Sequence, residues 1–233
     1  MHDHPRVGLL LHLLATVVKN QGRSDEAKAL YEEALRINVA ALGDMHPDIA
    51  QTHNNLAIVF HGEGDLQTAL EHFEKAAEID SAVVGADHPR NINAYANIAL
   101  THSALGHLDE ARDFLERADV IATEHLPAGN ETRERTRMSL AKLRFDQGDL
   151  RVGLQMYRES LQSLEASSPE SPAVPRAHQT LGNMLCETGR PDQALVELRR
   201  AAAKLERLQV DPDEMQRLRD EIAECGREKK RGS

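Results

Sequence analysis

The chain has 233 residues, a net charge of −10 and 3% aromatic residues, with no tryptophan. The acidic balance argues against nucleic-acid binding, because phosphate neutralisation needs a basic surface. The sequence contains no GxxxxGK loop, no nucleophile elbow and no HExxH or CxxC motif, so we expect no enzyme activity, no metal site and no cofactor.

A repeat of 42 residues organises the sequence. His-Pro dipeptides begin at His4, His46 and His88, 42 residues apart. A glycine that is expected to close a helix recurs at Gly22, Gly64, Gly106, Gly148 and Gly189. A period of this length, held over five copies, is typical of a stacked helical array.

Within each copy, small residues alternate with large apolar ones at helical spacing. In the reference copy, His46 to Ile79, Ala69 is followed by Phe73 and then by Ala76. Small side chains let two antiparallel helices approach closely, and the large ones fill the space to the next pair. Each copy therefore predicts a pair of helices.

This pattern, with its His-Pro start and the NNLA run at Asn54 to Ala57, resembles the tetratricopeptide repeat, and its length resembles the kinesin light chain subtype. The resemblance covers residues 4–208. It implies an all-α, right-handed superhelical solenoid of five antiparallel helix pairs and a C-terminal capping helix. We expect repeats at about 4–45, 46–87, 88–129, 130–170 and 171–208. Such arrays serve as protein-binding scaffolds.

Repeat 1 carries more leucines than one buried stripe needs. Leu9, Leu10 and Leu13 stand out in a first helix expected from about Pro5 to Gln21, and no polar cap precedes it. These residues predict an interface, either for homo-oligomerisation or for docking on an upstream domain. The alternative is that the leucines pack on the rest of repeat 1 and on repeat 2. The apolar run Val7 to Val18 is too short to span a membrane.

The first helices of repeats 2 and 3 present amide-rich faces. In the resembled family the first helices line a concave groove, so the resemblance implies that these faces meet a ligand. Amides both donate and accept hydrogen bonds, which suits an extended peptide backbone. Alternatively, they bond to neighbouring helices and organise the stack. The predicted groove residues of repeats 2 and 3 are Gln51, Asn54, Asn55, Ile58, Asn93, Asn97 and Leu100.

Repeats 4 and 5 follow a turn-rich break at residues 125–130 and are more basic. Their predicted groove residues are Arg135, Met138, Lys142, Arg176, Gln179 and Asn183. The cations favour an acidic ligand for this half. Arg133 and Arg137, outside the groove face, are expected to form solvated pairs with Glu131 and Glu134.

After repeat 5, residues 209–227 predict a capping helix with an apolar stripe of Met215, Leu218, Ile222 and Cys225. Residues 228–233 are expected to form a basic disordered tail. Cys186 and Cys225 lie in different predicted helices and are expected to be reduced, Cys186 as a tolerated small apolar residue, so we predict a cytoplasmic protein.

These observations predict a non-enzymatic interaction scaffold that holds an extended, acidic partner segment in its concave groove, without nucleic acid or membrane. The alternative is an assembly or regulatory module. In that case the uncapped leucine face of repeat 1 mediates homo-oligomerisation or docking to a larger signalling protein.

Overall fold

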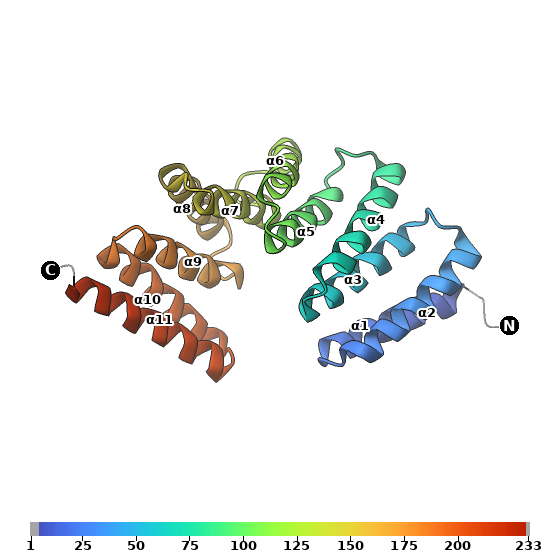
Figure 1. The fold of residues 1–233 in the computed structure, drawn as a ribbon, viewed down its shortest axis with the longest axis horizontal. Helices are drawn as coiled ribbons and strands as arrows, with labels where there is room; N and C mark the ends of the chain where they lie inside the picture. The colour runs from blue at the N-terminus through green and yellow to red at the C-terminus, as the bar shows by residue number, and fades with distance from the viewer. Residues whose placement is uncertain (1–4, 232–233) are drawn as a thin grey trace. The chain divides into compact units, whose positions relative to one another are not determined.

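A computed structural model describes residues 5–231, with the side chains of residues 6–227. The backbone of these residues forms eleven α-helices and no β-strand (Figure 1), which confirms the all-α prediction. The helices are α1 (Pro5–Asn20), α2 (Ser24–Leu42), α3 (Pro47–Glu63), α4 (Leu66–Val84), α5 (Asn91–Ala104), α6 (Leu108–His125), α7 (Glu131–Asp146), α8 (Leu150–Ser167), α9 (Ala173–Glu187), α10 (Pro191–Leu208) and α11 (Pro212–Arg231). The repeat boundaries and the right-handed superhelix stay predictions.

Glycine closes the turn between the two helices of a pair, as its spacing predicted. At the end of α3, Gly64 has φ 84°, a left-handed conformation that side chains with a Cβ rarely adopt. The N–H of Gly64 donates to the carbonyl of His61 at 3.1 Å, and the N–H of Asp65 donates to that of Phe60 at 3.0 Å. The Asp65 carboxylate then accepts from the N–H of Thr68 and begins α4.

The pairs stack by sharing a core. Leu56 and Val59 of α3 pack in one cluster with Ala15 of α1 and Tyr31 of α2, so α3 buries its apolar stripe against the preceding pair. The small residues at the crossings within the first three pairs are all fully buried, namely Ala15, Ala27, Ala57, Ala69, Ala99 and Ala111. This confirms the predicted role of the small residues.

The fourth pair needs a smaller residue than alanine at its crossing. A Cβ on Gly153 of α8 would lie 2.7 Å from the carbonyl oxygen of Ala141 and 2.8 Å from Cβ of Phe145. Alanine would therefore force α7 and α8 apart. The glycine that departs from the repeat pattern has a packing reason.

We expect Gly153→Ala to lower the free energy of unfolding by about 1 kcal/mol, because overpacking outweighs the better helix propensity of alanine. Gly62→Ala is the matched control, since Gly62 also lies in a helix but a Cβ there would have no atom within 4 Å. That change should raise the free energy of unfolding by about 0.5 to 1 kcal/mol. Urea denaturation of both variants tests the opposite signs, and a stabilising Gly153→Ala would contradict the packing argument.

The chain divides into two compact units, which we name unit 1 (Met1–His125) and unit 2 (Leu126–Ser233). Unit 1 contains α1 to α6 and unit 2 contains α7 to α11. The division falls at the turn-rich stretch of residues 125–130. Each unit is described by itself below.

Helix α11 covers the end of unit 2. Met215, Leu218 and Cys225 are buried in the core cluster that also contains Leu198 of α10, and Ile222 is partly buried against it. The helix continues to Arg231, so the prediction of disorder from residue 228 is wrong for 228–231. The sequence EKKR favours helix and places cations at the negative end of the helix dipole. Residues 232–233 of the predicted tail lie outside the described residues.

The two cysteines form a disulfide, which corrects the prediction that both are reduced. Cys186 of α9 and Cys225 of α11 are bonded, with Cα atoms 6.1 Å apart. Within a unit, neighbouring first helices contact one another, as α1 and α3 do in unit 1, and α11 takes the place of a further first helix beside α9 in unit 2. Residues about 40 positions apart therefore meet, as Cys186 and Cys225 do at a separation of 39. The cytoplasmic prediction loses the support that reduced cysteines gave it.

Candidate binding surfaces of the first helices

In unit 1 the first helices α1, α3 and α5 follow one another along the stack (Figure 1). Their equivalent residues, 42 apart, point to the same side. Gln51 of α3 and Asn93 of α5 are exposed, and so are Ile58 and Leu100. We name this surface the first-helix face of unit 1; its residues are Leu9, Leu13, Gln51, Ile58, Asn93 and Leu100, all exposed.

The remaining predicted amides of unit 1 bond to neighbouring helices. Nδ2 of Asn97 on α5 donates to Oδ1 of Asn54 on α3 at 3.2 Å. Asn55 lies with Nδ2 3.2 Å from Nε2 of His12 on α1. The predicted alternative, that amides organise the stack, therefore describes these three asparagines, which stay partly exposed at the edge of the first-helix face.

The three predicted groove residues of α7 differ in how far they are exposed to solvent. Arg135 is exposed, and the described residues give its guanidinium no ion-pair partner. Lys142 is partly buried and pairs with Asp146 at 2.7 Å. Met138 is 5% exposed and belongs to the core of unit 2, so its prediction as a groove residue is wrong. Its long, flexible side chain turns inward and fills the core.

The predicted partners of the other α7 arginines are also wrong. Glu134 is 4% exposed and accepts from the N–H of Gly129 and from Ser163, each at 2.8 Å. Arg133 instead donates to the carbonyl of Leu126 at 2.8 Å, and Arg137 lies 3.8 Å from Glu159 of α8. Glu134 therefore anchors the turn before α7, a role that helical spacing alone does not indicate.

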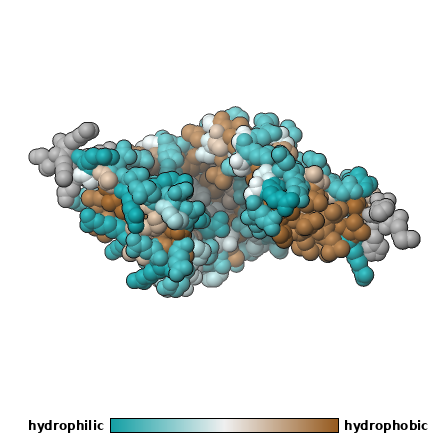
Figure 2. Space-filling view, turned by 90° about the horizontal axis from the view of Figure 1, so that it is seen from below, coloured by the Kyte–Doolittle hydropathy of each residue, from teal (hydrophilic) through white to brown (hydrophobic). Residues whose placement is uncertain are grey.

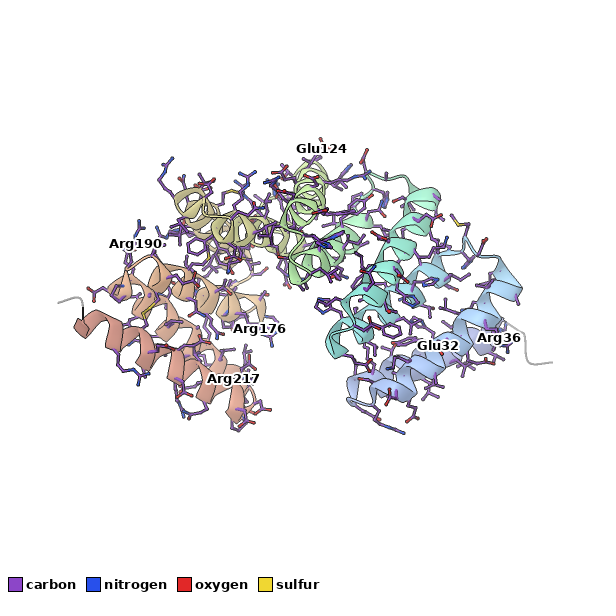
Figure 3. All side chains as sticks on the ribbon, viewed as in Figure 1. Glu32, Arg36, Glu124, Arg176, Arg190 and Arg217 are labelled. Carbon is purple, nitrogen blue, oxygen red and sulfur yellow. A yellow bond between two sulfur atoms is a disulfide. The ribbon has the colours of Figure 1, made fainter. Side chains whose placement is uncertain are left out.

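In α9 the predicted groove residues meet acidic side chains of α11. Nε2 of Gln179 donates to both carboxylate oxygens of Glu221, at 3.0 and 2.9 Å, and Asn183 donates to the same group at 3.3 Å. Arg176 lies 3.7 Å from Glu214 but keeps a side chain that is 70% exposed (Figure 3). This part of unit 2 thus already holds carboxylates against the amide and guanidinium donors of a first helix.

The charges of the two units differ. Residues 1–125 contain nine lysines and arginines against twenty aspartates and glutamates, whereas residues 126–233 contain nineteen against eighteen. The net charges are therefore −11 and +1, which together give the −10 of the chain. This difference agrees with the prediction from the sequence that repeats 4 and 5 are more basic than repeats 1 to 3.

A titratable pair between first and second helices was not predicted. In unit 1, Nδ1 of His53 on α3 lies 2.8 Å from Nδ1 of His72 on α4. Burial lowers the pKa of His53 to about 4, with a contribution from His72, and burial also lowers the pKa of His72. The equivalent positions of α5 and α6 hold Tyr95 and Phe114, whose rings are 5.9 Å apart.

In α9 and α10 of unit 2 the equivalent positions hold His178 and Glu197. His178 is 1% exposed, with Nδ1 2.7 Å from Glu197 and Nε2 3.4 Å from Glu165. Each ring nitrogen of His178 therefore faces a carboxylate oxygen. The hydrogen bond from His178 is the main cause that lowers the pKa of Glu197. The repeat position, and not a motif, is the signal that identifies these pairs.

Two classes of site are absent from the described part of the chain. Within residues 5–231, no helix has the length and apolar character that crossing a membrane requires. The described side chains also include no group of three or more His, Cys, Asp or Glu residues that could hold a metal ion.

The sequence profile of the tetratricopeptide repeat family matches residues 6–80 and 48–118. No curated protein sequence matches the chain. Among solved structures, a kinesin light chain-like protein with nearly identical TPR-like repeats from Podosopora anserina has a TM-score of 0.70 and 22% identity. The match covers 89% of this chain and 99% of that one.

Two further structures have the same fold. BtubC (BKLC) from P. vanneervenii has a TM-score of 0.70 and 21% identity, over 85% of this chain and 79% of its own. The Rap conjugation gene regulator of the plasmid pLS20, solved in complex with the Phr* peptide, has a TM-score of 0.70 and 15% identity. That match covers 85% of this chain and 53% of the regulator.

Proposed function

Because the chain is a tetratricopeptide repeat protein, we propose that it is a non-enzymatic interaction module that binds an extended segment of a partner protein. Repeats of this family generally mediate protein–protein interaction. The observation that carries the proposal is the first-helix face of unit 1, where exposed amides stand beside exposed aliphatic side chains.

The chemistry of this face suits an extended peptide. The side chains of Gln51 and Asn93 can donate to and accept from a peptide backbone, and Ile58 and Leu100 offer apolar contact to its side chains. Peptide recognition of this kind takes register from polar contacts and affinity from apolar ones. The Phr* complex of the Rap regulator is a precedent for peptide binding on this fold.

For unit 2 we propose that the bound segment is acidic. Arg135 is exposed and without an ion-pair partner among the described residues, and Arg176 is largely exposed. The carboxylates of α11 already bind donors of α9, which supports carboxylates as ligands of this surface. Charge of this kind sets orientation and association rate more than affinity.

We expect Arg135→Ala to weaken binding of an acidic peptide about threefold to tenfold, because a partly exposed charge contact contributes of the order of 1 kcal/mol. The probe is a short labelled peptide of alternating Glu and Leu, compared with its Gln/Leu counterpart by fluorescence anisotropy. Arg199→Ala on the second helix α10 is the matched control, since Arg199 is also exposed.

Only the acidic peptide should respond to Arg135→Ala, and added salt should weaken its binding. Gln51→Ala and Asn93→Ala should weaken both peptides. Circular dichroism must show that each variant keeps its helical content. Unchanged affinity in all three variants would contradict the proposal that the first helices form the binding surface.

A further inference from the structure

Helix α1 exposes a stripe of apolar side chains. Leu10 is 65% exposed, Leu14 50% and Val17 54%, and Val7 precedes them on the same side. We name these four residues the α1 seam. The alternative predicted from the sequence, that the excess leucines pack within repeats 1 and 2, is therefore wrong. Figure 2 shows a large hydrophobic area beside the N-terminal end of the molecule.

The seam occupies repeat positions that are buried in the first helices of later repeats. The residues 42 positions after those of the seam are Ile49, Thr52, Leu56 and Val59 of α3, and none of them is more than 4% exposed. Leu56 and Val59 are covered by α1 and α2, as their shared core cluster shows. The same positions in α5 and α9 are also buried. The seam is thus the surface through which a first helix packs on other helices, and in α1 no described residue covers it.

The described residues at the other end of the chain offer no matching surface. Helix α11 occupies the last first-helix place, with Leu218 and Cys225 buried. Its outward side is exposed and charged, with Arg217, Asp220 and Glu224. A head-to-tail contact between copies would therefore place charged groups against the seam. Among the described residues, the large exposed apolar side chains outside α1 are spread over several elements, so the seam is the apolar stripe that a second copy can offer.

The seam suits self-pairing. Its residues follow at spacings of three, four and three, the pattern with which two helices interdigitate along a common line. No charged residue lies between Arg6 and Lys19, so pairing buries no charge at the centre. Contacts between identical surfaces close as a two-fold dimer.

We propose that two copies of the chain associate through the α1 seam, with their α1 helices paired about a two-fold axis. The proposal is independent of peptide binding. It also predicts the opposite response to salt, because the dimer brings together two units of net charge −11. Screening of this repulsion should tighten the dimer as salt rises.

Sedimentation velocity over a concentration series tests the proposal. The wild type should approach twice the monomer mass of 25.9 kDa, and the double change Leu10→Glu and Leu14→Glu should raise the dimer dissociation constant more than tenfold. Both residues are exposed, so the fold should persist, as circular dichroism will show. Leu100→Glu is the matched control, because Leu100 is 58% exposed on α5 but lies outside the seam.

Crosslinking tests whether the two copies pair through the seam. Leu13 lies beside the middle of the seam, so a cysteine introduced by Leu13→Cys should crosslink readily to its copy, whereas one introduced by Leu100→Cys should not. A wild type that stays monomeric at all concentrations would overturn the proposal. So would a seam variant that dimerises as well as the wild type, or a monomer that uses the seam to bind a different protein.

Discussion

Reduction of the Cys186–Cys225 disulfide is expected to lower the free energy of unfolding of unit 2 by about 3 to 4 kcal/mol. The bond closes a loop of 39 residues, and the chain-entropy account gives a crosslink of that span a stabilisation of this size. Unit 1 contains no cysteine and serves as an internal reference. Hydrogen exchange read by mass spectrometry should show faster exchange in α9 to α11 after a dithiol is added, with α1 to α6 unchanged.

The double change Cys186→Ala and Cys225→Ala is the control for lost packing. Because Cys225 is 2% exposed, its replacement also removes a buried sulfur. The double variant, which has no cysteine, should match the reduced wild type to within about 1 kcal/mol. Two reactive thiols in the denatured but unreduced wild type would contradict the disulfide, and equal stability of the oxidised and reduced forms would contradict its role.

Reduction should loosen α11 without releasing it at once. Met215 and Leu218 still bury apolar surface against the core of unit 2, and Glu221 still accepts hydrogen bonds from Gln179 and Asn183. The crosslink therefore limits the opening of a helix that packing already holds. Exchange in α11 should rise more than exchange in α10, because the end of α11 near Cys225 loses its only covalent anchor.

The helical hairpins could be predicted from the sequence because their determinants are local and periodic. Gly64 closes a helix through its own backbone conformation, and Ala57 and Ala69 are small wherever two helices cross. Such requirements recur in each copy and leave a visible period. Gly153 breaks the pattern, and its cause, the nearness of Phe145, needs the packed structure to be seen.

The surfaces were harder to predict because helical spacing gives a side of a helix but not the partner that it meets. Asn54 and Asn97 could equally face a ligand or each other, and the structure joins them. Met138 shares a side with Arg135, yet its flexible side chain turns into the core. The Cys186–Cys225 bond follows from the same stacking of first helices, about 40 residues apart, but only once α11 is known to be one of them.

Acidification from pH 7.5 to pH 4.5 is expected to lower the free energy of unfolding of unit 1 by roughly 2 kcal/mol through His53. Burial lowers the pKa of His53 from 6.5 to about 4 in the folded chain. Above pH 6.5 the His53 side chain is neutral in both the folded and the unfolded state, so its titration does not lower the free energy of unfolding. Below pH 6.5 His53 binds a proton in the unfolded state but stays neutral in the folded state. The free energy of unfolding therefore falls until the pH reaches about 4.

The chain itself supplies the matched variant for this effect. Replacing His53→Tyr and His72→Phe installs the pair that α5 and α6 hold as Tyr95 and Phe114 at the equivalent positions. Carboxylates also titrate over this range, so the informative quantity is the difference between the wild type and this double variant at each pH. The difference at pH 7.5 reports packing alone, and its change by pH 4.5 reports the histidine pair.

Histidine Cε1 proton shifts in the wild type measure the same quantity directly. One resonance, that of His53, should titrate near pH 4, because a second proton on the His53–His72 pair breaks their hydrogen bond as well as entering a buried site. If every histidine titrates near pH 6.5, or if wild type and double variant lose stability in parallel, the pair contributes nothing to acid sensitivity. A low titration together with a flattened pH profile in the variant would make repeat 2 the acid-sensitive part of unit 1.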